Sequence, residues 1–181
     1  DVDMLFLFEK RVPSRTEKLI QEIIYPLWDI GLEVGYATRS LKECLSLARQ
    51  DFEVLTSLLD ARFLCGMSNL YSRMMEEVRH KIIMGKTKKI TRWLIETNTI
   101  RHQRLGDSTY LLEPNLKEGQ GGLRDYHTMF WLARIKSDLK QARDLEYYGY
   151  LSSEEYSTFL EALHFVWNVR NRLHQLTGRK C

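Results

Sequence analysis

Glu-Pro-Asn-Leu-Lys-Glu-Gly-Gln-Gly-Gly-Leu-Arg-Asp, residues 113–125, is the stretch from which the rest of the chain is interpreted. Its three glycines allow the backbone to adopt positive φ and to approach other groups closely. The apolar pattern of residues 126–135 predicts a helix directly after the loop, with unpaired N–H groups facing it. Lys117 and Arg124 add two cations. The stretch therefore predicts an anion or nucleotide-phosphate site, or else a tight loop whose glycines serve packing alone.

The segments on both sides of this loop predict a helical lobe over residues 67–181. Apolar residues at helical spacing indicate a helix over residues 70–82, ended by Gly85, and another over residues 90–97. A capping box at residues 152–155 predicts the start of a long helix. The residues expected on its apolar side are Phe159, Leu163, Val166, Trp167, Val169, Leu173 and Leu176.

Residues 1–66 predict a small α/β lobe. Residues 1–8 and 32–38 have the composition of strands. Ser-x-x-Glu capping boxes at residues 14–17 and 40–43 predict helices to about residues 30 and 49. Residues 57–64 fit a strand or a helix, and a strand there gives the order strand, helix, strand, helix, strand. We therefore predict an α+β, predominantly helical fold, with a small mixed-sheet lobe, a helical lobe and a ligand cleft between them.

Two acids open the first strand. Asp1 and Asp3 are two positions apart, so on a strand they point to the same face. Adjacent carboxylates repel, and a divalent cation such as Mg²⁺ compensates them with oxygen ligands. The alternative is that both lie in an exposed loop before the strand. Asp60 lies within an otherwise apolar run, and a buried acid needs a partner. It either pairs with Arg62 on one face of a strand or is a third carboxylate of the metal site, a role for which Glu33 competes.

Composition excludes several classes of function. The net charge of +3 over 181 residues is too small to indicate nucleic-acid binding. Three scattered cysteines argue against a zinc site or a disulfide framework and suit a reducing cytoplasm. No apolar run reaches the length of a membrane span, and no signal peptide is visible. Both ends look cut, so the chain is expected to be a fragment of a longer protein.

Four segments resemble the central nucleotidyltransferase region of the bacterial PII uridylyltransferase/uridylyl-removing enzymes, in the polymerase-β-like superfamily. They are residues 1–7, 31–40, 58–66, and 101–104 with 113–125, and the last block is the most specific. The resemblance spans essentially the whole chain. The superfamily's upstream Gly-Gly/Ser motif, the HD-type hydrolase domain and the glutamine-sensing ACT domains are missing from it. The resemblance therefore implies a truncated transferase region that is inactive or very weak alone, with the missing domains in cis.

This resemblance implies a reaction and a set of site residues. UMP would pass from UTP to a tyrosine of the PII nitrogen-signalling protein, with release of pyrophosphate. Two Mg²⁺ ions, or Mn²⁺, would be held by Asp1, Asp3 and Asp60, which form the implied catalytic set. Asp125 would orient Arg124 or accept a hydrogen bond from the ribose or base. The residues implied to line the nucleotide site are Lys117, Gly121, Gly122, Arg124 and Asp125, with His102 and Arg104 as secondary candidates.

Two other functions remain open at this stage. An adenylyltransferase of the same superfamily would carry the same aspartates and glycine loop, because nothing here identifies the base. A non-catalytic nucleotide-sensing or protein-interaction module would keep the loop without the chemistry. Nucleic-acid and membrane partners are not expected.

Overall fold

The computed structural model describes residues 2–105, 115–137 and 139–178. The chain divides into two compact units, residues 1–85 and 86–181. The first unit contains β1 (Val2–Phe8), α1 (Thr16–Asp29), β2 (Val34–Ser40), α2 (Leu41–Gln50), α3 (Phe52–Asp60), α4 (Ser68–Val78) and the π-helical stretch η1 (Arg79–Ile83). The second contains most of α5 (Met84–Leu105), then α6 (Leu123–Ser137), α7 (Asp144–Tyr147) and α8 (Ser153–Thr177). The predicted boundary after residue 66 falls between α3 and α4.

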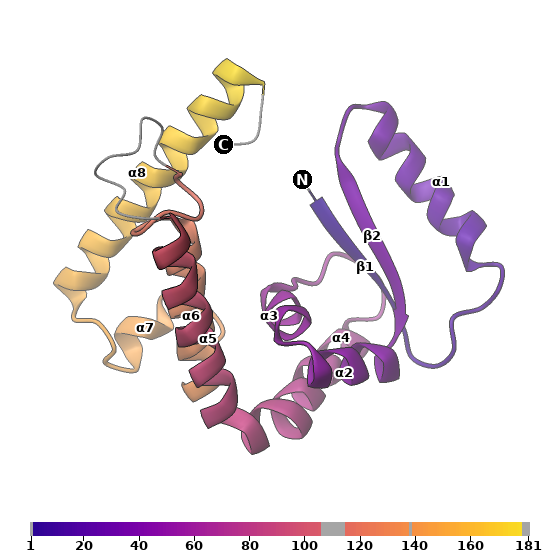
Figure 1. Ribbon diagram of the computed structural model, residues 1–181. Helices are drawn as coiled ribbons and strands as arrows, with labels where there is room; N and C mark the ends of the chain where they lie inside the picture. The colour runs from indigo at the N-terminus through magenta and orange to yellow at the C-terminus, as the bar shows by residue number, and fades with distance from the viewer. Residues whose placement is uncertain (1, 106–114, 138, 179–181) are drawn as a thin grey trace. The chain divides into compact units, whose positions relative to one another are not determined.

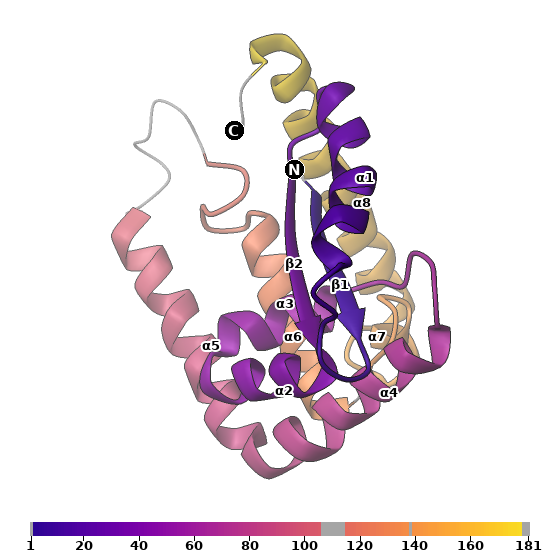
Figure 2. The same cartoon turned by 90° about the vertical axis from the view of Figure 1, so that its right-hand side faces the viewer.

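The first unit is built on a parallel strand pair. β1 and β2 pair in register from Val2 opposite Val34 to Phe8 opposite Ser40, and α1 connects them. Figures 1 and 2 show α1 along one face of this pair. The side chains packed between α1 and the strands are Ile20, Ile24, Leu27, Met4, Phe6 and Val34. Since side chains alternate along a strand, Asp3 lies on the face opposite α1.

The predicted α+β, mostly helical fold is confirmed, but the third strand is wrong. Residues 52–60 form α3, because Asp51 caps this helix by accepting a hydrogen bond from the N–H of Glu53 at 2.8 Å. Its buried leucines, Leu55, Leu58 and Leu59, recur at helical rather than strand spacing. In the described part of the chain the sheet is therefore the β1–β2 pair alone.

Two of the three predicted capping boxes are confirmed. Ser40 with Glu43 and Ser152 with Glu155 each make both reciprocal hydrogen bonds. The box predicted at residues 14–17 is wrong, because α1 begins at Thr16 and its N-cap, Arg15, has helical dihedral angles and makes no capping bond. A capping side chain needs an extended N-cap backbone, which positions 40 and 152 have.

Gly85 does not end a helix, contrary to the sequence prediction. Helical structure continues from α4 through η1 into α5, and Gly85 is the second residue of α5. A glycine ends a helix when it adopts the left-handed conformation after the last turn. Gly178 does so after α8, with φ of 62°, whereas Gly85 has no positive φ.

The second unit packs α6, α7 and α8 around a small core. Phe130 and Ala133 of α6 are buried with Leu139 and Leu145, and Phe159 of α8 packs against them. The apolar side predicted for α8 is only partly used, because Leu163 is the one buried residue of that helix. None of the helices in the described part of the chain is long and apolar enough to cross a membrane.

Candidate functional site

Asp3 lies directly over a glycine of the neighbouring strand. It pairs with Gly35 in the parallel register. A Cβ atom added to Gly35 would lie 2.8 Å from Asp3 Oδ1, so any larger residue there would displace the carboxylate. The Asp3 side chain is exposed. The missing side chain at position 35 therefore leaves room for the Asp3 carboxylate above β2.

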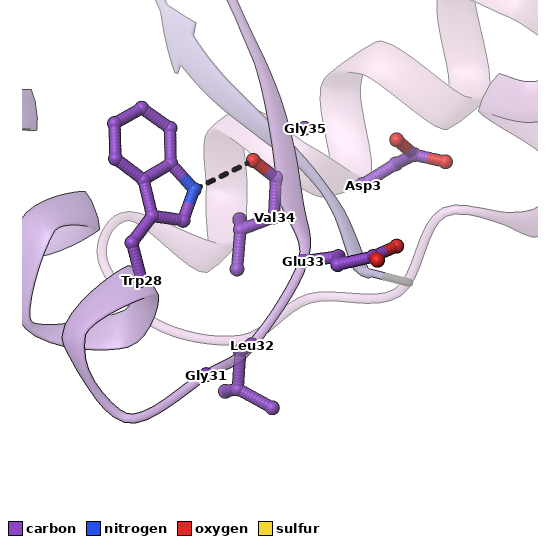
Figure 3. A pocket seen from close by; sticks show the side chains of 7 residues that line it. All are labelled: Asp3, Trp28, Gly31, Leu32, Glu33, Val34 and Gly35. Atoms are coloured by element: carbon purple, nitrogen blue, oxygen red, sulfur yellow. Dashed lines mark hydrogen bonds between the residues drawn. The ribbon is translucent and has the colours of Figure 1, made fainter. Parts of the chain in front are cut away.

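An open pocket of about 570 Å³ adjoins this carboxylate. Figure 3 shows the side chains of Asp3 and Glu33 on one side of the start of β2 and the indole of Trp28 on the other. Trp28 donates a hydrogen bond through Nε1 to the carbonyl oxygen of Val34 at 3.0 Å. The pocket lining comprises Asp3, Trp28, Gly31, Leu32, Glu33, Val34 and Gly35. The turn before β2 is thus held in place beside two carboxylates.

The other predicted carboxylates are placed differently. Asp60 is the last residue of α3, is exposed and does not line this pocket. The idea that it sits in a buried apolar run is therefore wrong. Asp1 lies outside the described residues. Within residues 2–105, 115–137 and 139–178, no group of three His, Cys, Asp or Glu side chains is arranged to hold a metal ion. The exposed oxygens of Asp3 and Glu33 nevertheless have the hard-ligand chemistry that Mg²⁺ prefers.

The glycine loop of the second unit satisfies its own backbone. The N–H groups of Leu123 and Arg124, at the start of α6, donate to the carbonyl oxygens of Leu116 and Lys117 at 3.0 and 2.8 Å. The N–H of Asp125 donates to Gly122 at 3.0 Å. The expectation of free N–H groups at this helix start is therefore wrong for these three residues, and they are not ready-made donors for a phosphate.

Two of the loop glycines are required by close packing. A Cβ on Gly119 would lie 2.6 Å from the carbonyl oxygen of Asn115. A Cβ on Gly122 would lie 2.8 to 3.0 Å from three backbone carbonyl oxygens. Gly121 has φ of 76°, a region that side chains rarely adopt. Packing therefore explains Gly119 and Gly122, and backbone conformation explains Gly121, which leaves a nucleotide-binding role for Gly121 and Gly122 as a prediction.

The predicted cations lie around this loop. Arg124 donates through its guanidinium to Glu118 Oε1 at 3.1 Å. The Lys117 ammonium lies 4.0 Å from the same carboxylate, and its side chain is about half exposed. Arg104 is exposed in the last turn of α5. Glu118 thus holds Arg124 and Lys117 on one side of the loop.

Asp125 is the centre of a polar cluster that ties the loop to α5. Its Oδ2 accepts from the N–H of Gly121 at 2.7 Å, and its Oδ1 accepts from Arg101 and lies 2.8 Å from His102 Nε2. The Arg101 guanidinium also donates to the carbonyl oxygen of Glu118. The cluster unites the predicted residues His102 and Asp125. Arg101 was not predicted as a site residue, although it lies beside His102 in the block of residues 101–104.

The surrounding hydrogen bonds and charges keep Asp125 and Glu118 ionised. Burial alone would raise the pKa of Asp125, but the N–H of Gly121 and the side chains of Arg101 and His102 outweigh it and lower that pKa. Burial likewise opposes ionisation of Glu118, and the hydrogen bond and charge of Arg124 lower its pKa overall. Both carboxylates are therefore negative near neutral pH.

Asp125→Asn is expected to make the protein less sensitive to acid. A lowered folded-state pKa contributes stability above the unfolded-state pKa, about 3.9, and that contribution is lost as pH falls through the folded-state value. At pH 7 the variant should lose about 1–3 kcal/mol of unfolding free energy. Urea unfolding at pH 7, 4 and 3 measures this difference, which should shrink as pH falls. A difference that stays constant with pH would contradict the pairing.

An apolar pocket of about 360 Å³ lies beside the glycine loop. It runs between α6 and α8 and is lined by Gly121, Gly122, Leu123, Asp125, Tyr126, Met129, Phe159, Ala162, Leu163 and Val166. The Tyr126 ring stacks on Phe159 with centroids 5.7 Å apart. Sequence reasoning missed this pocket, because helical periodicity shows which faces are apolar but not which two faces meet.

Comparisons with known proteins agree on one family. A family model described as GlnD PII-uridylyltransferase matches residues 89–181. The chain is 38% identical over 179 residues to a bifunctional uridylyltransferase/uridylyl-removing enzyme of Rhodopseudomonas palustris. Enzymes of the same description from Nitrobacter hamburgensis and Phenylobacterium zucineum are 39% and 38% identical over the same length. Each alignment covers 99% of this chain but 19% of the relative. No solved structure matches the chain.

Proposed function

The chain belongs to the GlnD PII-uridylyltransferase family, and from this we propose that it contributes to the transfer of UMP from UTP to a tyrosine of the PII signal protein. The observation that carries the proposal is the block of residues 101–125, which lies inside the matched segment. Its described part folds into the polar cluster around Asp125. Because the chain spans about a fifth of its curated relatives, the activity of a whole enzyme is part of the proposal. A cytoplasmic location follows from the same proposal.

The proposed chemistry is an in-line attack of the tyrosine oxygen on the α-phosphorus of UTP, with pyrophosphate as the leaving group. Such reactions depend mainly on positioning and on neutralising charge. Bound Mg²⁺ would neutralise charge on the phosphates. Asp1 and Asp3 are the proposed ligands, and the room above Gly35 supports Asp3 in this role because its carboxylate is exposed and unobstructed.

The third carboxylate has two candidates. Asp60 is proposed on the family resemblance, which matches its acid-x-Arg segment. Glu33 competes because it shares a pocket with Asp3. The two acids differ in position, at the end of α3 and just before β2, so single substitutions can separate their roles.

The nucleotide phosphates are proposed to contact the cations of the second unit. Lys117 is the best placed of these, because its side chain is half exposed and its ammonium is 4.0 Å from Glu118. Arg124 is partly buried against Glu118 and would turn toward a phosphate only by giving up that pair. Arg104 and His102 remain secondary candidates. The backbone of Gly121 and Gly122 would shape the loop beside these cations.

A transfer assay tests the proposal. The intact protein is incubated with MgCl₂, PII protein and UTP labelled at the α-phosphate, and in parallel with labelled ATP. The proposal expects label from UTP on a PII tyrosine, released pyrophosphate, and no label from ATP. Label from ATP alone would instead identify an adenylyltransferase. Nucleotide binding that needs no metal and leads to no transfer would indicate a sensing module.

A further inference from the structure

One arginine connects three segments of the second unit. The Arg101 guanidinium donates to Asn98 Oδ1 on its own helix, to the carbonyl oxygen of Glu118 in the loop, and to Asp125 Oδ1 on α6. Its side chain is only 10% exposed. We propose that Arg101 is a positioning residue that fixes the loop of residues 115–122 to α5 and α6.

The chemistry of the contacts explains why this position needs arginine. A buried cation is costly unless it is paired and hydrogen-bonded, and Asp125 supplies the opposite charge. Nη1 donates to the Glu118 carbonyl oxygen and Nη2 to Asn98 and Asp125, which suits the planar guanidinium with its five N–H donors. A lysine ammonium is a compact charge on a flexible stem and does not reproduce that geometry. Lysine at this position therefore keeps the charge and loses part of the connection.

Arg101 acts on the loop cations through Glu118. Its hydrogen bond to the Glu118 carbonyl fixes the backbone of that residue, while the Glu118 carboxylate holds Arg124 at 3.1 Å and Lys117 at 4.0 Å. On the other side, Asp125 holds the N–H of Gly121. Both ends of the glycine run thus depend on one guanidinium. The expected change in UTP binding rests on the proposed function. The expected loosening of the loop does not.

Hydrogen–deuterium exchange tests the effect on the loop directly. Arg101→Lys and Arg101→Ala are compared with the wild type by mass spectrometry of peptides covering residues 115–125. Amides of the loop and of the first turn of α6 should exchange about 10- to 100-fold faster in Arg101→Ala, and less so in Arg101→Lys. Arg92→Ala is the matched control, because Arg92 is exposed on the same helix and should leave exchange unchanged.

Kinetics in the intact protein separates positioning from chemistry. The KM for UTP should rise about tenfold in Arg101→Ala while kcat changes less, with partial rescue by lysine. Unchanged loop exchange in a variant with native circular dichroism would overturn the inference. If Arg101→Ala does not fold, Arg101→Lys alone decides. Faster loop exchange in the Arg101 variants, together with a wild-type protein that binds no UTP, would support the inference while contradicting the proposed function.

Discussion

Asp3→Asn is expected to reduce UMP transfer by about a thousandfold while leaving the fold intact. The substitution keeps the shape of the side chain and removes the negative charge that a hard cation requires. Charge stabilisation by a bound metal contributes several kcal/mol to such reactions, and each 1.36 kcal/mol is a factor of ten in rate. Because Asp3 is exposed, the unfolding free energy should change by no more than about 0.5 kcal/mol.

Two measurements check this expectation in the intact protein. Transfer of labelled UMP to PII gives the rate, and electron paramagnetic resonance of Mn²⁺ gives metal affinity independently of activity. Asp29→Asn is the control, since Asp29 is an exposed acid at the end of α1 in the same unit. Full transfer and unchanged Mn²⁺ binding in Asp3→Asn would remove Asp3 from the site.

The same assays decide between the two third-carboxylate candidates. Asp60→Ala should abolish transfer if the resemblance identifies the ligand correctly. Glu33→Ala should then have a smaller effect, limited to the pocket that it shares with Asp3. Full transfer in Asp60→Ala together with none in Glu33→Ala would reverse the assignment.

The parts of the fold that were predictable depend on local signals. The boxes at Ser40 and Ser152 were readable because a side chain three positions along the chain completes each of them. The segment that contains Asp60 was not, since the apolar run of residues 57–64 is too short for its pattern to separate a strand from a helix. Gly85 misled for a related reason, because a glycine tolerated inside a helix looks the same in sequence as one that ends it.

In the candidate site, too, local sequence signals did not reveal contacts between distant residues. Sequence identified the loop and the residues His102 and Asp125 but not Arg101, whose importance comes from contacts 17 and 24 positions away. It also could not show that the N–H groups of Leu123 and Arg124 are already engaged by Leu116 and Lys117. Long-range hydrogen bonds decide whether a glycine loop is free to bind, and they leave no local pattern.

Gly122→Ala is expected to destabilise the second unit by about 2–4 kcal/mol. The added Cβ would lie 2.8 Å from the carbonyl oxygen of Leu116, 2.9 Å from that of Gly119 and 3.0 Å from that of Lys117. All three are backbone atoms, so the backbone itself must move. That movement combines the cost of overpacking with the loss of hydrogen bonds made by the same carbonyl groups to residues 122–124.

The matched control is Gly85→Ala. Gly85 is helical, its φ is not positive, and an added Cβ has nothing within 4 Å. Alanine there should raise the unfolding free energy by about 0.5–1 kcal/mol, because it lowers the entropy of the unfolded chain. Urea unfolding followed by circular dichroism compares the two variants under one set of conditions.

Unfolding free energy and UTP affinity, measured on the same variant, distinguish a packing role of Gly122 from a phosphate-binding role. If packing requires Gly122, the variant loses unfolding free energy whether or not nucleotide is present, and any loss of UTP affinity follows from the displaced loop. If Gly122 is a glycine only so that a phosphate can approach, UTP affinity falls while the unfolding free energy matches the wild type. The three short distances to carbonyl oxygens favour the first result. Wild-type stability with weakened UTP binding would instead make the loop a direct phosphate contact, despite the engaged N–H groups at the start of α6.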